Sequence, residues 1–152
     1  MPGLRLTFTL PYGLEPLTRT LVRFGDATQD FTAVWDQIIA DARRITGQRF
    51  DEQGPGWAPL SERYAAEKAR THPGAPILVR SGELRYRLVT NPDVLEVTPL
   101  SFAYGIRASF YGRFHQTGTR NMPARPPFGF TEAHKREWVR IAQRHIIESG
   151  RS

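Results

Sequence analysis

The sequence predicts an α+β fold: one domain in which an antiparallel sheet packs against two longer helices, about 30–47 and 131–148, and one or two short ones. Three observations predict it. An alternating apolar segment near the start is typical of a strand, apolar residues at helical spacing follow Asp30, and strand-like segments lie between two helical patterns. With 152 residues the chain is long enough to bury a core of its own.

The first element is a strand, because "LRLTFTL" (4–10) alternates apolar and polar residues with a period of two. Segment 11–29 then holds two prolines and two glycines, so we expect a loop or arm with one short element around 17–24. We assign 1–29 to this N-terminal strand and arm and 30–152 to the main part of the same domain.

The clearest periodicity in the chain begins after Asp30, a residue that can cap a helix. Seven apolar residues then form one broad helical stripe: Phe31, Val34, Trp35, Ile38, Ile39, Ala42 and Ile45. Gly47 predicts the end of this helix, because glycine readily takes the left-handed conformation that stops a helix.

A turn-rich loop with one large aromatic residue, Trp57, separates this helix from a short one. Ser61 is a predicted cap for a helix over 62–70, whose inner face we expect to contain Tyr64, Ala65 and the stem of Lys68. Two prolines and a glycine in "THPGAP" end it.

Segment 77–89, "ILVRSGELRYRLV", fits two structures. Leu84 and Leu88 suit a helical turn, whereas Leu84, Tyr86 and Leu88 equally suit a strand. We predict a short helix leading into a strand. "VLEVT" (94–98) and "SFAYGIRA" (101–108) then indicate two antiparallel strands joined by a tight link that contains proline.

Thr131 is the predicted cap of the last helix. Five residues share one face of it: Trp138, Ile141, Ala142, His145 and Ile146. We interpret His145 as a hydrogen-bonded structural histidine because it lies on this apolar face.

The chain is basic, with a formal net charge of +6 and a pI of about 10.3. Between Val97 and Thr131 it has four arginines and no acidic residue. The aromatic residues of this stretch could stack on nucleic-acid bases, but strand alternation explains about half of them as core residues. A basic single-domain nucleic-acid-binding protein without a virion role therefore stays open as an alternative.

The sequence shows no catalytic constellation. It has no cysteine, its four histidines lack the spacing of metal ligands, and no nucleophile-elbow or phosphate-loop motif is present. An HNH-type nuclease centre at His115 is disfavoured, because its surroundings lack a carboxylate and a second matching histidine. We predict no enzyme activity, cofactor or metal. Without a membrane-length apolar run or a signal peptide, the protein is expected to fold in a cytoplasm.

Two short blocks carry a family resemblance. One is W-x-P-L-S-x-x-Y-x-x-x-K, from Trp57 to Lys68. The other is H-Q-x-G followed by P-A-R-P-x-F-G, from His115 to Gly129. Their order and spacing resemble the phage virion morphogenesis family, the Mu-like group of tail-completion or neck proteins. The resemblance covers about 30–148, and segment 11–29 is longer than we expect for the family.

The resemblance implies a structural virion protein that forms a ring at the head–tail junction, completes or terminates the tail and joins it to the head connector. The implied partners are further copies of the chain, six by family resemblance, the tail tube protein and the connector or stopper proteins. Genomic DNA would cross the lumen without sequence-specific contact. The implied location is the tail or neck of the virion, after assembly in the host cytoplasm.

Segment 110–130 is the predicted subunit boundary. The prolines of "MPARPPFG" favour a stiff extended segment, which loses little entropy on docking. The predicted interface residues are Phe114, His115, Arg125, Phe128 and Phe130, with Arg125 placed to fork onto a neighbour's carboxylate. The predicted channel-facing residues are Arg107, Arg113 and Arg120. Packing of Phe128 against its own C-terminal helix is the alternative for that residue.

Overall fold

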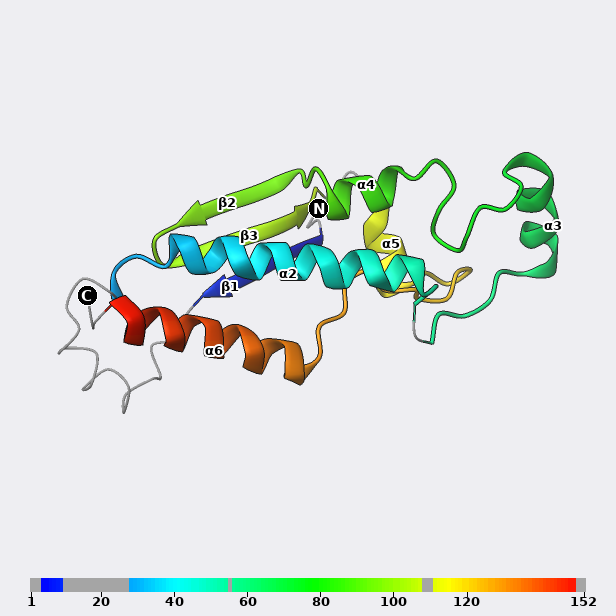
Figure 1. Ribbon diagram of the computed structural model, residues 1–152. Coiled ribbons are helices and arrows are strands. Elements are labelled where there is room, and N and C mark those ends of the chain that lie inside the picture. Colours follow the sequence, from blue (N-terminus) through cyan, green and yellow to red (C-terminus); the bar gives the residue numbers. More distant parts are fainter. Residues whose placement is uncertain (1–3, 10–27, 55, 108–110, 150–152) are drawn as a thin grey trace. The chain divides into compact units, whose positions relative to one another are not determined.

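A computed structural model of the chain describes residues 4–9, 28–54, 56–107 and 111–149. The helices of this part are α2 (Thr32–Asp51), α3 (Glu62–Thr71), α4 (Glu83–Val89), α5 (Gly112–Thr117) and α6 (Glu132–Ser149). The strands β1 (Leu4–Thr9), β2 (Val94–Thr98) and β3 (Ser101–Ile106) form one sheet in the order β1-β3-β2 (Figure 1). The predicted α+β class is confirmed.

The described chain divides into two compact units. The helix–sheet unit comprises the described parts of Leu6–Ala42, Leu95–Tyr104 and Phe130–Ser152. The loop unit comprises the start of β1 and the described parts of Arg43–Val94 and Gly105–Gly129.

In the helix–sheet unit, the first half of α2 packs on the sheet, as predicted. The ring of Trp35 lies 5.5 Å from that of Phe102 on β3, measured between centroids. The indole N–H of Trp35 donates to the carbonyl of Thr98, at 3.0 Å, at the end of β2. Phe31, Val34, Trp35 and Ile38 are all buried, so the predicted apolar stripe is the core-facing side of this helix.

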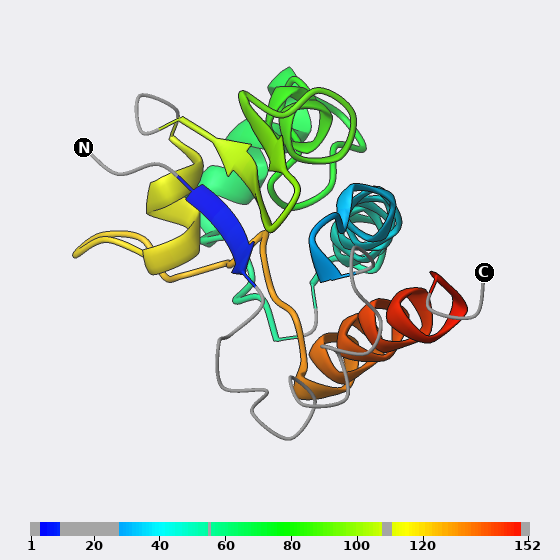
Figure 2. The same cartoon turned by 90° about the vertical axis from the view of Figure 1, so that its left-hand side faces the viewer.

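Helix α6 runs beside the first half of α2 in the same unit (Figures 1 and 2). The indole N–H of Trp138 donates to the carboxylate of Asp41 at 2.8 Å. The Nε2 atom of His145 lies 3.0 Å from the carbonyl oxygen of Asp30, and its ring is 5.5 Å from that of Phe31. The structural role predicted for His145 is therefore confirmed.

The predicted capping residues Asp30 and Thr131 lie just before the first residues of the two long helices, Thr32 and Glu132. The carboxylate of Asp30 accepts a hydrogen bond from the N–H of Thr32, at 2.8 Å, and a second from its hydroxyl. At α6, the hydroxyl of Thr131 accepts from the N–H of His134, while Nδ1 of His134 accepts from the N–H of Thr131. His134 thus takes the place that Glu or Gln usually has in a reciprocal capping box.

The predicted end of α2 at Gly47 is wrong, because the helix continues to Asp51. Gly47 does not have a positive φ, whereas Gln53 and Gly54 beyond the helix do. Continuing the helix buries Phe50, whose ring lies 5.7 Å from that of Trp57. The indole lies so close to Gly54 that a Cβ there would be 2.0 Å from it, so the stop falls at Gly54.

The short elements of the loop unit correct two further predictions. In α4, Leu84 and Leu88 are buried and Tyr86 is exposed, so the predicted short helix is confirmed, whereas the strand predicted to follow it within 77–89 is wrong because the helix continues to Val89. In α3, only Lys68 is buried; Tyr64 is exposed and its predicted inner position is wrong. Figure 1 shows α3 at the end of long connecting loops, apart from α4 and α5.

The predicted short element around 17–24 lies outside the described residues, as does most of the arm. The division into an arm (1–29) and a main part (30–152) therefore stays a prediction.

Candidate assembly surface

The second sequence block contains a buried arginine. Arg125 is 5% exposed. Its guanidinium donates to the carbonyl of Ala58, from Nε at 2.6 Å, and to that of Pro59, from Nη2 at 2.7 Å. Its backbone N–H donates to the carbonyl of His115 at 2.7 Å. These contacts, which we call the Arg125 network, connect the two sequence blocks within the loop unit.

The residues after Arg125 are held in the same way. The side-chain amide of Gln116 forms two hydrogen bonds with the backbone of Phe128, at 3.1 Å to its carbonyl and 3.2 Å from its N–H. Trp57 donates to the carbonyl of Pro126, and Arg49 to that of Gly129. A Cβ at residue 129 would lie 2.2 Å from the guanidinium of Arg49, so a larger residue there would require this side chain to move from its hydrogen bond.

The turn after α5 also requires glycine. Gly118 has a φ of +74°, and a Cβ there would lie 2.8 Å from the backbone nitrogen of Ala124. Thr119 and Met122 then close a tight bridge. The residues of the two sequence blocks thus bond mainly to one another, and these bonds hold the extended segment 122–129 in place.

These contacts change the expected roles of two predicted interface residues. Two backbone carbonyls occupy the guanidinium of Arg125, so in this arrangement it does not reach a neighbour's carboxylate. Phe128 is buried within the loop unit. Phe130 packs on the C-terminal helix, with its ring 5.1 Å from that of Trp138.

The exposed large aromatic side chains among the described residues of this region lie at the start of α5. Tyr111 and Phe114 are 43% and 44% exposed, and the guanidinium carbon of Arg113 lies 4.9 Å from the centre of the Phe114 ring. We call these three residues the α5 surface. Burial, and then the charge of Glu83 on α4, raise the pKa of Tyr111. Aromatic residues and arginine are the types most enriched at the centres of protein interfaces.

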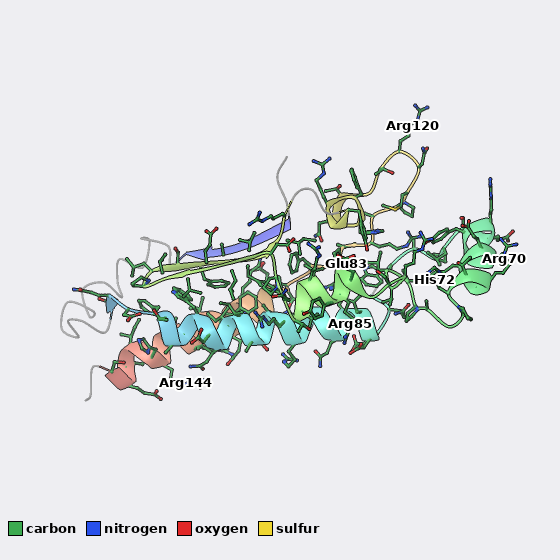
Figure 3. All side chains as sticks on the ribbon, turned by 90° about the horizontal axis from the view of Figure 1, so that it is seen from above. Arg70, His72, Glu83, Arg85, Arg120 and Arg144 are labelled. Carbon is green, nitrogen blue, oxygen red and sulfur yellow. The ribbon has the colours of Figure 1, made fainter. Side chains whose placement is uncertain are left out.

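The predicted channel-facing arginines are found at different places in the loop unit. Arg120 lies at the tip of the turn after α5 and is directed away from the ribbon (Figure 3). Arg113 contacts Phe114, and Arg107 is exposed at the end of β3, where its backbone N–H donates to Asp93. Their predicted contact with DNA stays a prediction.

Two titratable groups are affected by the charge of Arg125. The Nδ1 atom of His115 is buried and forms no hydrogen bond with the described residues. Burial, and then the charge of Arg125, lower the pKa of His115 from its ordinary value. Burial and the same guanidinium also lower the pKa of Lys68, whose ammonium donates to the carbonyl of Pro76. The structure therefore brings the basic residues Lys68 and His115 under the influence of Arg125, although these three residues lie far apart in the sequence.

The described residues contain no cluster of three or more His, Asp or Glu side chains that could hold a metal ion. Among the described helices, none combines the length and apolar character that crossing a membrane requires.

Fold and site together define a small α+β protein whose motif residues support its own loops beneath an exposed aromatic–arginine surface. The model of the phage virion morphogenesis family matches residues 13–147, and the chain belongs to this family. The match confirms the resemblance, and it includes most of segment 11–29, which we had expected to depart from the family pattern. Comparison with curated proteins and with solved structures found no match. Family membership points to a structural role in the phage virion.

Proposed function

We propose that this chain is a ring-forming subunit of the head–tail junction, where it completes the tail and joins it to the head connector. The observation that carries the proposal is the family match over 13–147, which spans both described units. The proposed partners are other copies of the chain, the tail tube protein on one side and connector or stopper proteins on the other.

The α5 surface supports a role in contact with other proteins. Phe114 and Tyr111 expose large aromatic area, which is favourable to bury at an interface. Helix α5, which carries Phe114, is held at His115 by the Arg125 network and at Gln116 by the bonds to Phe128, so docking costs little further ordering. In this proposal His115, Arg125 and Phe128 act from beneath the surface, by holding α5, and Phe114 makes the contact.

Particles from a phage that lacks the gene test this proposal. Without the chain we expect full heads and tails that fail to join, and supplying it in trans should restore joined particles. Electron microscopy of labelled chain should place it at the neck. Particles that assemble and infect normally without it, or a label at the distal tail end, would contradict the proposal.

A matched pair of variants tests the α5 surface itself. Phe114→Ser should reduce the yield of joined particles, whereas Ile147→Ser, at an equally exposed apolar position on α6, should leave it unchanged. Equal yields from the two variants would show that Phe114 makes no contact needed for assembly.

The second candidate function is nucleic-acid binding without a virion role, favoured by the acid-free arginine stretch 97–131. A purified chain that binds DNA with a steep salt dependence, and that is absent from purified particles, would favour it.

A further inference from the structure

Strand β2 is an edge of the sheet and carries exposed apolar side chains. In the described residues the sheet order β1-β3-β2 leaves β2 without a neighbour on its outer side. Leu95 is 48% exposed and Val97 39%, and Leu100 in the adjoining turn is also exposed. Proteins usually protect such an edge with lysine, proline or a covering element, because an open apolar edge pairs readily with another strand.

The exposed residues continue the face that forms the core. Only Pro99 and Leu100 separate β2 from β3, so we expect Val97 to lie opposite Phe102 and Leu95 opposite Tyr104. Phe102 and Tyr104 are fully buried, and Phe102 packs on Trp35. An apolar surface therefore extends from the core to the open edge, where a further strand would cover it.

The edge is also held in a fixed position. The carbonyl of Thr98 accepts from the indole of Trp35, and the carbonyl of Pro99 accepts from the N–H of Phe31 at 2.8 Å. The hydroxyl of Thr98 bonds to Ser101 across the turn. Because the strand is already ordered, pairing with it costs little conformational entropy.

The opposite edge of the same sheet is β1, and its sequence suits β2. The sequence of β1 alternates apolar and polar residues, and that of β2 does so from Leu95 onward, so a shared register can keep the apolar rows on one face. Each has one charged residue, Arg5 in β1 and Glu96 in β2, so pairing brings no like charges together. Figure 1 shows both strands running opposite to β3, which makes a β2–β1 pair between copies parallel.

We propose that β2 of one copy pairs with β1 of the next copy, so that the sheet continues from subunit to subunit. Contacts between two unlike edges are heterologous, and heterologous contacts close into rings when the rotation between copies is a fraction of a full turn. The inference rests on the proposed ring, and it identifies the surface through which the ring forms.

Charged substitutions on β2 test whether the edge is used. Leu95→Lys and Val97→Lys should abolish self-association of the full chain and its incorporation into particles. Ile147→Lys, at 47% exposure on α6, is the matched control and should change neither. Circular dichroism and urea unfolding verify that each variant is folded, since all three positions are exposed. Normal incorporation of both β2 variants would overturn the inference.

Cysteine crosslinking identifies the strand that occupies the edge, because the chain has no cysteine of its own. In particles assembled with the double variant Glu96→Cys/Thr7→Cys, a short bismaleimide should give a ladder of covalent multimers. Either single variant should give none.

The other outcomes overturn the inference in distinguishable ways. Efficient dimers from Glu96→Cys alone would show that β2 pairs with β2. Normal incorporation without crosslinks would mean that another partner covers the edge, and the ring proposal would stand. Absence of the unmodified chain from particles would overturn the proposed function as well.

Discussion

Arg125 bonds to backbone carbonyls that lie 66 and 67 residues earlier in the chain. A guanidinium can donate two nearly parallel hydrogen bonds, whereas the ammonium of lysine cannot reproduce this geometry. Because the site is buried, a carbonyl oxygen that lost its bond to the guanidinium could not bond to water instead. The residue is thus a structural donor for the loop that leads into α3.

We predict that Arg125→Lys lowers the free energy of unfolding by about 2–4 kcal/mol, the cost of losing charge-assisted bonds at a buried site. Urea unfolding measures the effect. Arg120→Lys, at the exposed tip of the turn, should change it by less than about 0.5 kcal/mol. Equal stability of the two variants would mean that the carbonyls of Ala58 and Pro59 find other donors.

The lowered pKa of His115 predicts a pH dependence of stability. The unfolded chain gains a proton on this residue near its ordinary pKa of 6.5, whereas the folded chain resists protonation until the pH is lower. The contribution of His115 to the free energy of unfolding should therefore be constant above about pH 7 and fall as the pH decreases through about 6.5.

Urea unfolding between about pH 5 and pH 7.5 measures this slope. His115→Gln has no titrating ring and should reduce the slope over that interval. The carboxylates of Asp30 and Glu132, whose pKa values are lowered by their hydrogen bonds to Thr32 and Lys135, contribute only in a more acidic range. An unchanged slope in the variant would contradict the role given to His115.

At the scale of elements, sequence patterns predicted those with a long apolar stripe or strict alternation. Helices α2 and α6 were predicted because their apolar residues repeat at helical spacing over many residues. The hairpin of β2 and β3 was predicted because a short link with proline separates two strand-like segments. Helix α5 was not, since six residues beginning at Gly112 are too few to show a period. The burial of Tyr64 was predicted wrongly because Lys68 is the only buried residue of α3. The apolar residues of this helix therefore do not mark a face that packs on a core.

The assignment of α4 gives a test at this scale. Leu88 is fully buried and Tyr86 is exposed, as a helix requires but a strand does not. We expect Leu88→Ala to destabilise the protein by about 2–4 kcal/mol through loss of buried area and cavity formation. Tyr86→Ala should cost less than about 0.5 kcal/mol. Similar costs for both variants would favour the strand alternative that the sequence left open.

The candidate site was predictable only in part. Sequence composition indicated an arginine–aromatic region, and Phe114 and Arg113 are indeed exposed or half-buried there. The hydrogen-bond partners of Arg125 were not predictable, because backbone carbonyls exist at every residue and carry no sequence signal. The same holds for Gln116, whose amide bonds to the backbone of Phe128.

For the whole molecule, the charge is divided unequally between the units. The loop-unit ranges contain fourteen basic and six acidic residues, whereas the helix–sheet ranges contain seven and nine. The net positive charge of the chain therefore lies in the loop unit. An asymmetry of this kind orients a protein toward an anionic partner.

We predict that exchanging Arg107, Arg113 and Arg120 together for Gln weakens binding of the chain to duplex DNA. If all three meet phosphates, the slope of log affinity against log salt should become shallower by about 2.7, or 0.9 for each contact. Fluorescence anisotropy over a series of salt concentrations measures it. Exchanging Arg136, Arg140 and Arg144 on α6 is the control. An unaltered slope in the first variant would remove these arginines from the DNA path.

The distance along the chain between Arg125 and its acceptors has a consequence for synthesis on the ribosome. At elongation rates of about 5–20 residues per second, the 67-residue separation means that Ala58 emerges on the order of 3–13 seconds before Arg125. Throughout that interval the nascent polypeptide presents these carbonyls to water and to chaperones. Translation speed over this part of the message therefore sets how long the region waits for its donor.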